Sequence, residues 1–358
     1  MLKRLFIKNF TVFAEADFEF GPGLNVVVGT NGTGKSHVLK LGYVTGYSAI
    51  NIIGDEWLVQ DTHNWQNQVS RDFQELFRPE RIGRLVRWGA DNAEITAQYS
   101  NPSLASVKLR FAAAAQMPVV IGKQPVEVEE FLPIEYELFV PVFIPAKEVL
   151  TLSWMLPAVD QLKLPIDSSY LQLLNQLRGI DRQQPAAPSA ISAISEILGG
   201  EMKQEGDKYY LVKADGQRIE SDMVAEGLRK FGILQRLLNN GNLTPKNTLF
   251  WDEPEANLNP ALLQKLAAVL AKLARQGFQI ILATHSLFLL KELHILSRQK
   301  TAEKLPVRYF GLNSGEDGAT AVTTVDSFDE LPDIVALDVQ LEQNELFLDV
   351  LNDSDANI

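Results

Sequence analysis

The chain of 358 residues contains no cysteine, which excludes disulfide bonds and thiolate metal sites. It also lacks an apolar run long enough to cross a membrane, because the nearest stretch, Phe111 to Ile121, is short and contains Gln116 and Pro118. The first ten residues, MLKRLFIKNF, carry charges but no apolar segment of the length found in signal peptides. We therefore expect a cytoplasmic protein with no membrane partner.

Positive charge is missing from the last part of the chain. No lysine or arginine follows Arg308, whereas twelve aspartates and glutamates lie between Glu316 and Asp355. The first 308 residues are balanced, with 33 basic and 33 acidic residues, and we see no basic stripe for nucleic acid in them. The acidic end is either a solvated helical face or a docking surface for a basic partner.

A glycine-rich loop follows an apolar strand near the start of the chain. Gly29 to Ser36, GTNGTGKS, fits G-x-x-x-x-G-K-[S/T] at every fixed position, and it lies between LNVVV and a segment that can be helical. Glycines let successive backbone N–H groups point at phosphate oxygens, and the start of a helix adds partial positive charge. We expect Lys35 to reach the β- and γ-phosphates of a nucleoside triphosphate and the Ser36 hydroxyl to coordinate Mg²⁺.

Two acidic residues, Asp252 and Glu253, end a second apolar strand in NTLFWDEPE. Asp252 can hold Mg²⁺, and Glu253, which points elsewhere, can polarise the attacking water as general base. A third strand, QIILAT, leads to His285. A lone histidine is usually structural, but at a strand end beside a phosphate site it can contact the γ-phosphate, and we favour that role. The remaining histidines are interpreted as surface or packing residues: His37, His63 and His294.

A turn of small residues opens a long amphipathic helix between these two regions. It contains Ala225, Glu226 and Gly227, and its N–H groups form another helix start that can bind an anion. Because the chain already has one complete phosphate loop, we interpret this turn as the contact to the nucleotide of a second copy.

The order of these motifs resembles the heads of ABC-type ATPases. Within them the chain resembles the soluble branch that includes RecF-like, structural-maintenance-of-chromosomes (SMC) and OLD-family ATPases, and especially the stand-alone AAA family ATPases found beside effector genes in bacterial defence systems. The stretches that carry the resemblance are IKNFTVFAEADFEFGPGLNVVVGTNGTGKS, FIPAKE, VAEGLRKFG, FWDEPEANLNP and the strand ending in THS. It implies an α/β fold, an ABC-ATPase head with a mixed P-loop sheet, an antiparallel β lobe and a compact helical insertion.

The resemblance also implies a chemistry: slow hydrolysis of ATP, with Mg²⁺, by a head-to-tail pair of subunits that hold two ATPs between them. The implied catalytic residues are Lys35, Glu253 and His285, and the implied metal ligands are Ser36 and Asp252. The implied nucleotide-binding residues are Asn31, Gly32, Thr33, Gly34, Lys35, Ser36 and His37 of one copy, with Ala225, Glu226 and Gly227 of the other.

Two positions, Ala225 and Asn259, differ from the family pattern, and one glutamine of that pattern has no certain counterpart in this chain. Family signatures often have serine where Ala225 stands, so one hydrogen bond to the γ-phosphate is expected to be missing. The loop after the acidic pair often has aspartate where Asn259 stands, and both changes would slow hydrolysis without preventing dimerisation. The glutamine that commonly ends the first lobe is either Gln98 or absent, and Gln98 is equally well interpreted as an exposed strand residue.

The motifs divide the chain into four expected segments. They are residues 1–150, the first part of the head with the P-loop and antiparallel lobe; 151–200, the helical insertion; 201–305, the second part of the head; and 306–358, an acidic β-hairpin and helical end. Fifty residues folded back as two helices reach only about 37 Å, and no heptads are sustained. The insertion is therefore expected to be a compact interaction lobe and not a long arm.

Two local expectations concern the first segment. FVPVFIPAKE predicts a strand that ends at Lys147 and Glu148, which form either a nucleotide-sensing contact or a surface ion pair. Residues 52–87 are expected to be mainly helical, with an aromatic face packed into a core. That face consists of Trp57, Trp65, Phe73 and Phe77.

Two functions fit these observations. In the first, ATP closes the dimer and hydrolysis opens it, so that the chain is a switch or sensor controlling a partner effector, such as a nuclease, in a bacterial defence-type complex. In the second, the chain is a DNA-repair or chromosome-associated head, against which the short insertion and the lack of a basic stripe count. A transporter ATPase is disfavoured because VAEGL lacks the serine and paired glycines of a transporter signature. No nuclease or protease constellation is visible, so an effector activity would belong to another chain.

Overall fold

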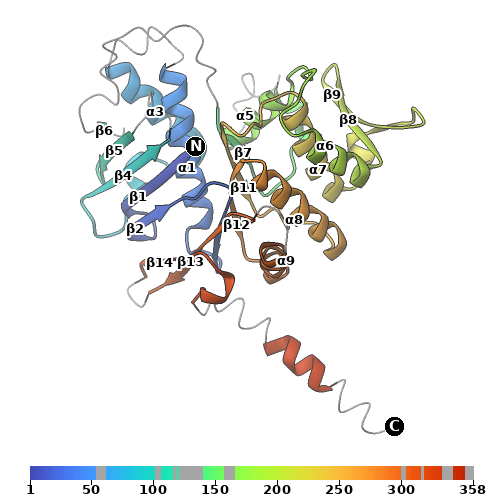
Figure 1. Cartoon of the computed structure of the whole chain (residues 1–358). Helices are drawn as coiled ribbons and strands as arrows, with labels where there is room; N and C mark the ends of the chain where they lie inside the picture. The colour runs from blue at the N-terminus through green and yellow to red at the C-terminus, as the bar shows by residue number, and fades with distance from the viewer. Residues whose placement is uncertain are drawn as a thin grey trace.

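The computed structural model describes residues 1–53, 62–100, 106–115, 119–120, 140–156, 166–299, 304–315, 318–332 and 342–350. At its centre lies a six-stranded sheet in the order β14-β13-β3-β12-β11-β7 (Figure 1). The strands are β3 (Leu24–Gly29), β7 (Val142–Ile144), β11 (Thr248–Asp252), β12 (Gln279–Thr284), β13 (Val307–Ser314) and β14 (Thr320–Val325). All neighbouring pairs are parallel except β13 with β14, which is antiparallel. The predicted mixed sheet is therefore confirmed.

The central sheet separates two apolar cores. Successive side chains of a strand point to opposite faces, and in β3 Val26 and Val28 join one core while Val27 joins the other. Both faces are covered, so every residue of β3 is buried. This burial on two sides explains why the three valines of β3, residues 26–28, follow one another without alternating with polar residues.

One core lies between the central sheet and an antiparallel sheet of order β2-β1-β4-β5-β6. Its strands are β1 (Leu2–Phe10), β2 (Phe13–Glu19), β4 (Asn92–Tyr99), β5 (Ser106–Ala112) and β6 (Val119–Val120). Helix α1 (Lys35–Ile53), helix α3 (Thr62–Phe77) and the short helix η1 (Ile82–Leu85) belong to this side. Phe73 is buried here and Phe77 packs against it, as expected. Trp57 and the side chain of Trp65 lie outside the described residues.

The other core is helical (Figure 1). Its helices are α5 (Ser168–Leu177), α6 (Pro188–Leu198), α7 (Glu226–Asn239), α8 (Pro260–Arg275) and α9 (Leu287–Arg298), with the short helices η3 (Leu150–Leu152) and η4 (Ser221–Met223). A small sheet of order β10-β9-β8 packs beside them. It consists of β8 (Gly200–Glu205), β9 (Lys208–Lys213) and β10 (Arg218–Glu220).

The two described helices of the 151–200 segment, α5 and α6, are short and share the helical core. Leu174 of α5 and Ile194 of α6 are fully buried in the same cluster as Val26 of the central sheet. Both helices pack against α7. These contacts make the segment part of the head's own core.

The β-hairpin of the last segment also belongs to the head. β13 pairs in parallel with β3, and the hairpin it forms with β14 joins Ser314 to Thr320 in register. The expected boundary at residue 305 therefore falls inside one sheet, because a pairing between strands so far apart in sequence leaves no local signal. The short helix η5 (Phe328–Glu330) follows, and the last described residues, 342–350, form a helix whose residues are all exposed. Among the described residues, no helix is long and apolar enough to cross a membrane.

Candidate active site

The phosphate loop, Gly29 to Ser36, connects the end of β3 to the start of α1. Gly32 and Gly34 have positive φ values of 85° and 92°, a region that favours glycine. A Cβ on Gly34 would lie 2.7 Å from two ring carbons of Phe13, so close packing against the turn between β1 and β2 also requires glycine there. Asn31 and Gly32 are exposed at the loop's tip, whereas Thr33 is buried and donates its hydroxyl to the Thr30 carbonyl over 2.9 Å.

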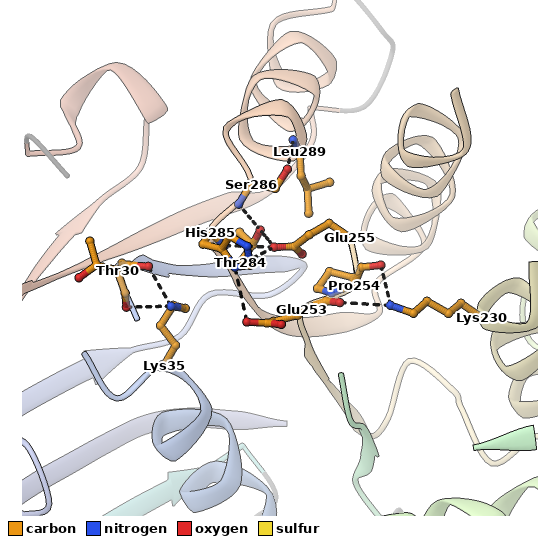
Figure 2. Close-up of polar contacts among 11 residues, drawn as sticks. Thr30, Lys35, Lys230, Glu253, Pro254, Glu255, Thr284, His285, Ser286 and Leu289 are labelled. Carbon is orange, nitrogen blue, oxygen red and sulfur yellow. Dashed lines mark hydrogen bonds and ion pairs between the residues drawn. The ribbon is translucent and has the colours of Figure 1, made fainter. Parts of the chain in front are cut away.

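The ammonium of Lys35 lies inside this loop. It donates to the carbonyl oxygens of Gly29 at 2.8 Å and Thr30 at 2.9 Å, and the residue is only 6% exposed (Figure 2). Burial lowers the pKa of Lys35, and the carboxylates of Glu253 and Asp252 oppose that shift. Lys35 is thus a cation that is held by backbone carbonyls and lies close to the acidic residues at the end of β11.

Asp252 and Ser36 meet where β11 ends beside α1. Burial raises the pKa of Asp252, while a hydrogen bond from Ser36 and the charges of Lys40 and Lys35 oppose the rise. The Oδ1 atom of Asp252 is buried and has no hydrogen-bond partner. A buried, unpartnered carboxylate oxygen next to a hydroxyl is a donor set that suits Mg²⁺, so the two predicted metal ligands fit the ion.

Glu253 and His285 follow adjacent parallel strands and their side chains approach each other. His285 Nδ1 lies 3.4 Å from Glu253 Oε1 and 3.6 Å from Glu255 Oε1 (Figure 2). Glu253 has a positive φ of 45°, which is uncommon outside glycine, and its N–H donates to the Ala283 carbonyl over 3.0 Å. With this backbone conformation the Glu253 carboxylate lies beside the histidine.

Glu255 is a site residue that the sequence did not reveal. Its side chain is 8% exposed and its Oε1 accepts hydrogen bonds from the Thr284 hydroxyl at 2.7 Å and the His285 N–H at 3.1 Å. Buried carboxylates are uncommon without partners, and here the partners fix the backbone that carries His285. The only sequence signal was a third acidic residue in DEPE, directly before the helix-capping segment.

The signature turn, Ala225 to Gly227, lies at the start of α7 and packs on the loop after Asp252. A Cβ on Gly227 would lie 2.9 Å from Leu258 Cδ2 and 3.0 Å from the Asn257 carbonyl. The Asn257 amide donates to Glu226 Oε1 over 2.7 Å. Ala225 is exposed, and no side chain caps the amino end of α7. The turn is thus exposed at Ala225 and attached at Glu226 and Gly227 to the loop after Asp252, which we call the catalytic loop, residues 253–258, after the role expected for Glu253.

Asn259, the second departure from the family pattern, is a helix cap. Its Oδ1 accepts a hydrogen bond from the Leu262 N–H over 2.9 Å at the start of α8, where Pro260 occupies the first turn. Asparagine and aspartate cap helices about equally well. The local fold therefore does not require aspartate at this position.

Two side chains that were candidates for nucleotide contact, His37 and Glu148, are instead used within the fold. The His37 ring is held by the Thr11 hydroxyl at 2.9 Å and by the edge of Phe10, and burial lowers its pKa to about 4. It is a packing group, so only the backbone N–H of His37 stays among the candidates. Glu148 forms no surface pair: it is buried, and Arg229 Nε lies 3.0 Å from its Oε2.

Gln98 does not join the site. It lies opposite Arg4 in the register of β4 with β1, whereas Thr11, which contacts His37, lies beyond the other end of β1. Gln98 is a half-buried residue of a strand, and a polar side chain at such a position needs no contact with a nucleotide.

The segment around η1 carries a basic cluster that the expectation of no basic stripe overlooked. Arg78 and Arg84 are exposed, Arg81 is half-buried, and Trp88 is 94% exposed. Arg84 has one distant acidic neighbour, Glu80, at 3.6 Å. The segment joins the antiparallel lobe through hydrogen bonds from the Thr11 N–H to Leu85 and from the Arg87 N–H to Asn9. The sequence signal for this cluster is the four arginines within RPERIGRLVRW. It was overlooked because the first 308 residues have equal numbers of basic and acidic residues.

The chain is similar in sequence to known families and proteins. Residues 136–291 match a family described as "AAA domain, putative AbiEii toxin, Type IV TA system", and residues 4–41 match a family described as "AAA domain". Over 50 residues the chain is 46% identical to the DNA repair protein RecN of Xylella fastidiosa, covering 14% of this chain and 9% of that protein. Over 123 residues it is 25% identical to the DNA replication and repair protein RecF of Aliivibrio fischeri, covering 34% and 24%. The chain thus spans less than a quarter of the length of these curated relatives.

Solved structures extend the similarity over nearly the whole chain. The SMC head domain from Thermotoga maritima aligns with a TM-score of 0.50 and 13% identity over 90% of this chain and 98% of that one. An Smc head domain with a coiled coil and joint from Pyrococcus yayanosii aligns with a TM-score of 0.54 and 12% identity over 96% and 99%. At such identities the likeness concerns the fold, which is the predicted head fold.

Proposed function

Because this chain is an ABC-type ATPase head of the RecF and SMC kind, we propose that it binds ATP with Mg²⁺, hydrolyses it, and joins a second copy head to tail around the nucleotide. One observation carries this proposal. The phosphate loop, Asp252, and the pair formed by Glu253 and His285 lie at the carboxyl ends of three adjacent parallel strands, β3, β11 and β12. In open α/β sheets, ligands bind at this edge.

Each residue of the site has a separate proposed role. The loop N–H groups and Lys35 would bind the phosphates, and Ser36 and Asp252 would hold Mg²⁺, which would supply positive charge next to the phosphate oxygens. Glu253 orients a water molecule and accepts its proton. His285, 3.4 Å from Glu253, is close enough to share that proton or to donate to a phosphate oxygen. Glu255 keeps the His285 backbone in place.

The second copy supplies the signature turn. Within one chain, Glu226 and Gly227 contact Asn257 and Leu258, on the loop after Asp252. Ala225 is exposed at an uncapped helix start, which attracts anions. A head-to-tail pair would place this turn against the triphosphate held by the phosphate loop of the other copy.

The test combines a variant with a size measurement. Glu253→Gln should bind ATP and elute from gel filtration as a dimer in the presence of ATP and Mg²⁺, and as a monomer without them. Lys35→Ala should stay monomeric in both conditions. If the parental chain hydrolyses no ATP, or if the Gln variant never dimerises, the proposal is wrong.

The dimer is proposed to act in the cytoplasm, where ATP is available, as a switch that controls a second protein in a defence-type complex. This step is supported by the AbiEii family match and by the exposed helix over 342–350, in which Leu346, Phe347 and Leu348 are 66%, 62% and 57% exposed among acidic residues. Co-expression with the products of neighbouring genes, followed by purification with and without ATP, would identify that protein. Co-purification that ignores the nucleotide state would argue against a switch.

A second function, a head that acts on DNA, is favoured by the basic cluster around η1. Arginines with an exposed tryptophan suit a nucleic-acid backbone and an unstacked base, and the matched relatives are named as DNA repair proteins. Arg81→Glu with Arg84→Glu should then weaken DNA binding in mobility-shift assays and reduce its salt dependence. If the parental chain shifts no DNA at low salt, with or without ATP, this function is excluded.

A further inference from the structure

Lys230 is a buried lysine that connects the signature helix to the catalytic loop. It lies on α7, one turn after Glu226, and is 1% exposed. Its ammonium donates to the carbonyl oxygens of Glu253 and Pro254, each over 3.3 Å (Figure 2). Figure 2 shows Lys230 reaching the loop from the side opposite His285.

The carbonyl that Lys230 holds belongs to the proposed general base. With φ at 45°, Glu253 sits in a backbone conformation that costs energy for a residue with a Cβ and persists only where its surroundings hold it. The Glu253 N–H donates to the Ala283 carbonyl, and the Glu253 carbonyl accepts from the Ala256 N–H at 3.1 Å and from Lys230 at 3.3 Å. A change at Lys230 would therefore alter the direction of the Glu253 carboxylate without touching it.

The same helix start is fixed to the loop at two more points. Glu226 accepts a hydrogen bond from Asn257, and Gly227 packs directly on Asn257 and Leu258. On its other side, Arg229 pairs with Glu148, just after β7. The first turn of α7 and residues 253–258 are thus joined by several contacts, of which Lys230 makes the most deeply buried one.

We propose that Lys230 is a positioning residue. When the signature turn of one chain contacts the nucleotide of a second copy, Lys230 transmits that contact to Glu253 of the same chain and so affects how Glu253 is placed. This inference rests on the proposed function. It predicts that hydrolysis in one site responds to occupation of the other, because Ala225 to Gly227 touch the neighbour's nucleotide while Lys230 touches the loop of its own.

The environment explains why a cation occupies this position. Burial lowers the pKa of Lys230 to about 8, while the carboxylates of Glu255, Glu226, Glu253 and Glu148 oppose that shift. Near neutral pH the side chain is therefore still mostly charged and donates to both carbonyls. An apolar side chain of equal length would fill the space but would remove this donor from both carbonyls, and the Glu253 carbonyl would keep only the hydrogen bond from the Ala256 N–H.

The experiment separates binding, dimerisation and turnover. Lys230→Met should bind ATP with a KM within about twofold of the parental value and should still form the ATP-dependent dimer on gel filtration. Its kcat should fall by roughly tenfold to a hundredfold, as expected when a catalytic group is misplaced. Lys230→Arg, which keeps the charge and the donors, should recover most of the rate. Lys265→Met, on the exposed face of α8, is the matched control and should behave as the parental chain.

Two outcomes would overturn the inference. The first is a Lys230→Met dimer that turns over ATP at the parental rate. The second is loss of folding, ATP binding and dimerisation together in both Lys230→Met and the milder Lys230→Gln, because that result assigns the lysine to stability alone. A parental chain without ATP hydrolysis would instead overturn the proposed function, so the two failures are distinguishable.

Discussion

Arg229 of α7 and Glu148, just after β7, form an ion pair of 3.0 Å between side chains that are only 13% and 3% exposed. Glu148 also accepts hydrogen bonds from the Leu150 N–H and the Thr151 hydroxyl, and Arg229 donates to the Val224 carbonyl over 2.7 Å. Both partners are thus also anchored to neighbouring groups of the fold, while Arg229 Nε is buried without a hydrogen bond of its own to the described residues. The pair links the edge of the central sheet to the helix that carries the signature turn.

Breaking this pair should destabilise the fold strongly. Glu148→Gln leaves a buried guanidinium without its counter-charge, and we expect a loss of about 3 kcal/mol in the free energy of unfolding, measured by urea denaturation. Glu148→Gln combined with Arg229→Met should cost clearly less than the sum of the two single changes, because no unpaired charge remains. Additive losses would show that the two charges are not coupled.

Removing the ammonium of the phosphate loop should abolish productive nucleotide binding. In Lys35→Ala, the charge-assisted hydrogen bonds to phosphate are lost, so ATP affinity should fall roughly 10- to 100-fold in a fluorescence titration. The Gly29 and Thr30 carbonyls that Lys35 occupies are then left without this donor. Asn31→Ala, at the exposed tip, is a milder comparison. Unchanged affinity in Lys35→Ala would remove this lysine from the site.

Neutralising the proposed general base should separate binding from turnover. Glu253→Gln keeps the size of the side chain but cannot accept a proton, so kcat should fall by roughly a hundredfold or more while ATP affinity stays near the parental value. Release of phosphate is the measurement. Glu255→Gln serves as the comparison, since it holds the His285 backbone and does not face water as a base. Parental turnover in the Glu253 variant would exclude the role.

Asp72 gives the fold a pH-dependent stability that is independent of the active site. Burial raises its pKa to about 6 from 3.8, although hydrogen bonds from Ser48 at 2.5 Å and Gln68 at 2.9 Å oppose the rise. Between these two pKa values the folded state binds more protons than the unfolded state, so the contribution of Asp72 to stability is complete below pH 4 and declines as pH rises through 6.

Asp72→Asn should remove that decline. Relative to the variant, the parental chain should lose about 2–3 kcal/mol of unfolding free energy between pH 4 and pH 7.5. The difference between the two urea curves isolates this residue, since all other carboxylates are shared. A constant difference across that pH range would contradict the raised pKa.

The sequence predicted those features that local patterns encode. Each of these features is encoded by residues close together in the chain. They are the phosphate loop from Gly29 to Ser36, the acidic pair at Asp252 and the hairpin after Val307. The sequence could not predict the roles of Lys230 and Glu255 or the ion-pair partner of Glu148. Each of these depends on a contact with a residue far away in the chain. A buried lysine in an amphipathic helix looks like any polar residue until the packing of the helix is known.

The placement of β13 also decides when during synthesis the site can exist. The strand that leads to the phosphate loop lies between β12 and β13, whose residues follow it by more than 250 positions. Contacts this distant in sequence form late. A nascent chain on the ribosome therefore exposes an apolar valine strand for most of its translation, and the ATP pocket closes only after residue 314 has left the exit tunnel. Until then this strand lacks its partners and is the kind of exposed apolar segment that favours aggregation.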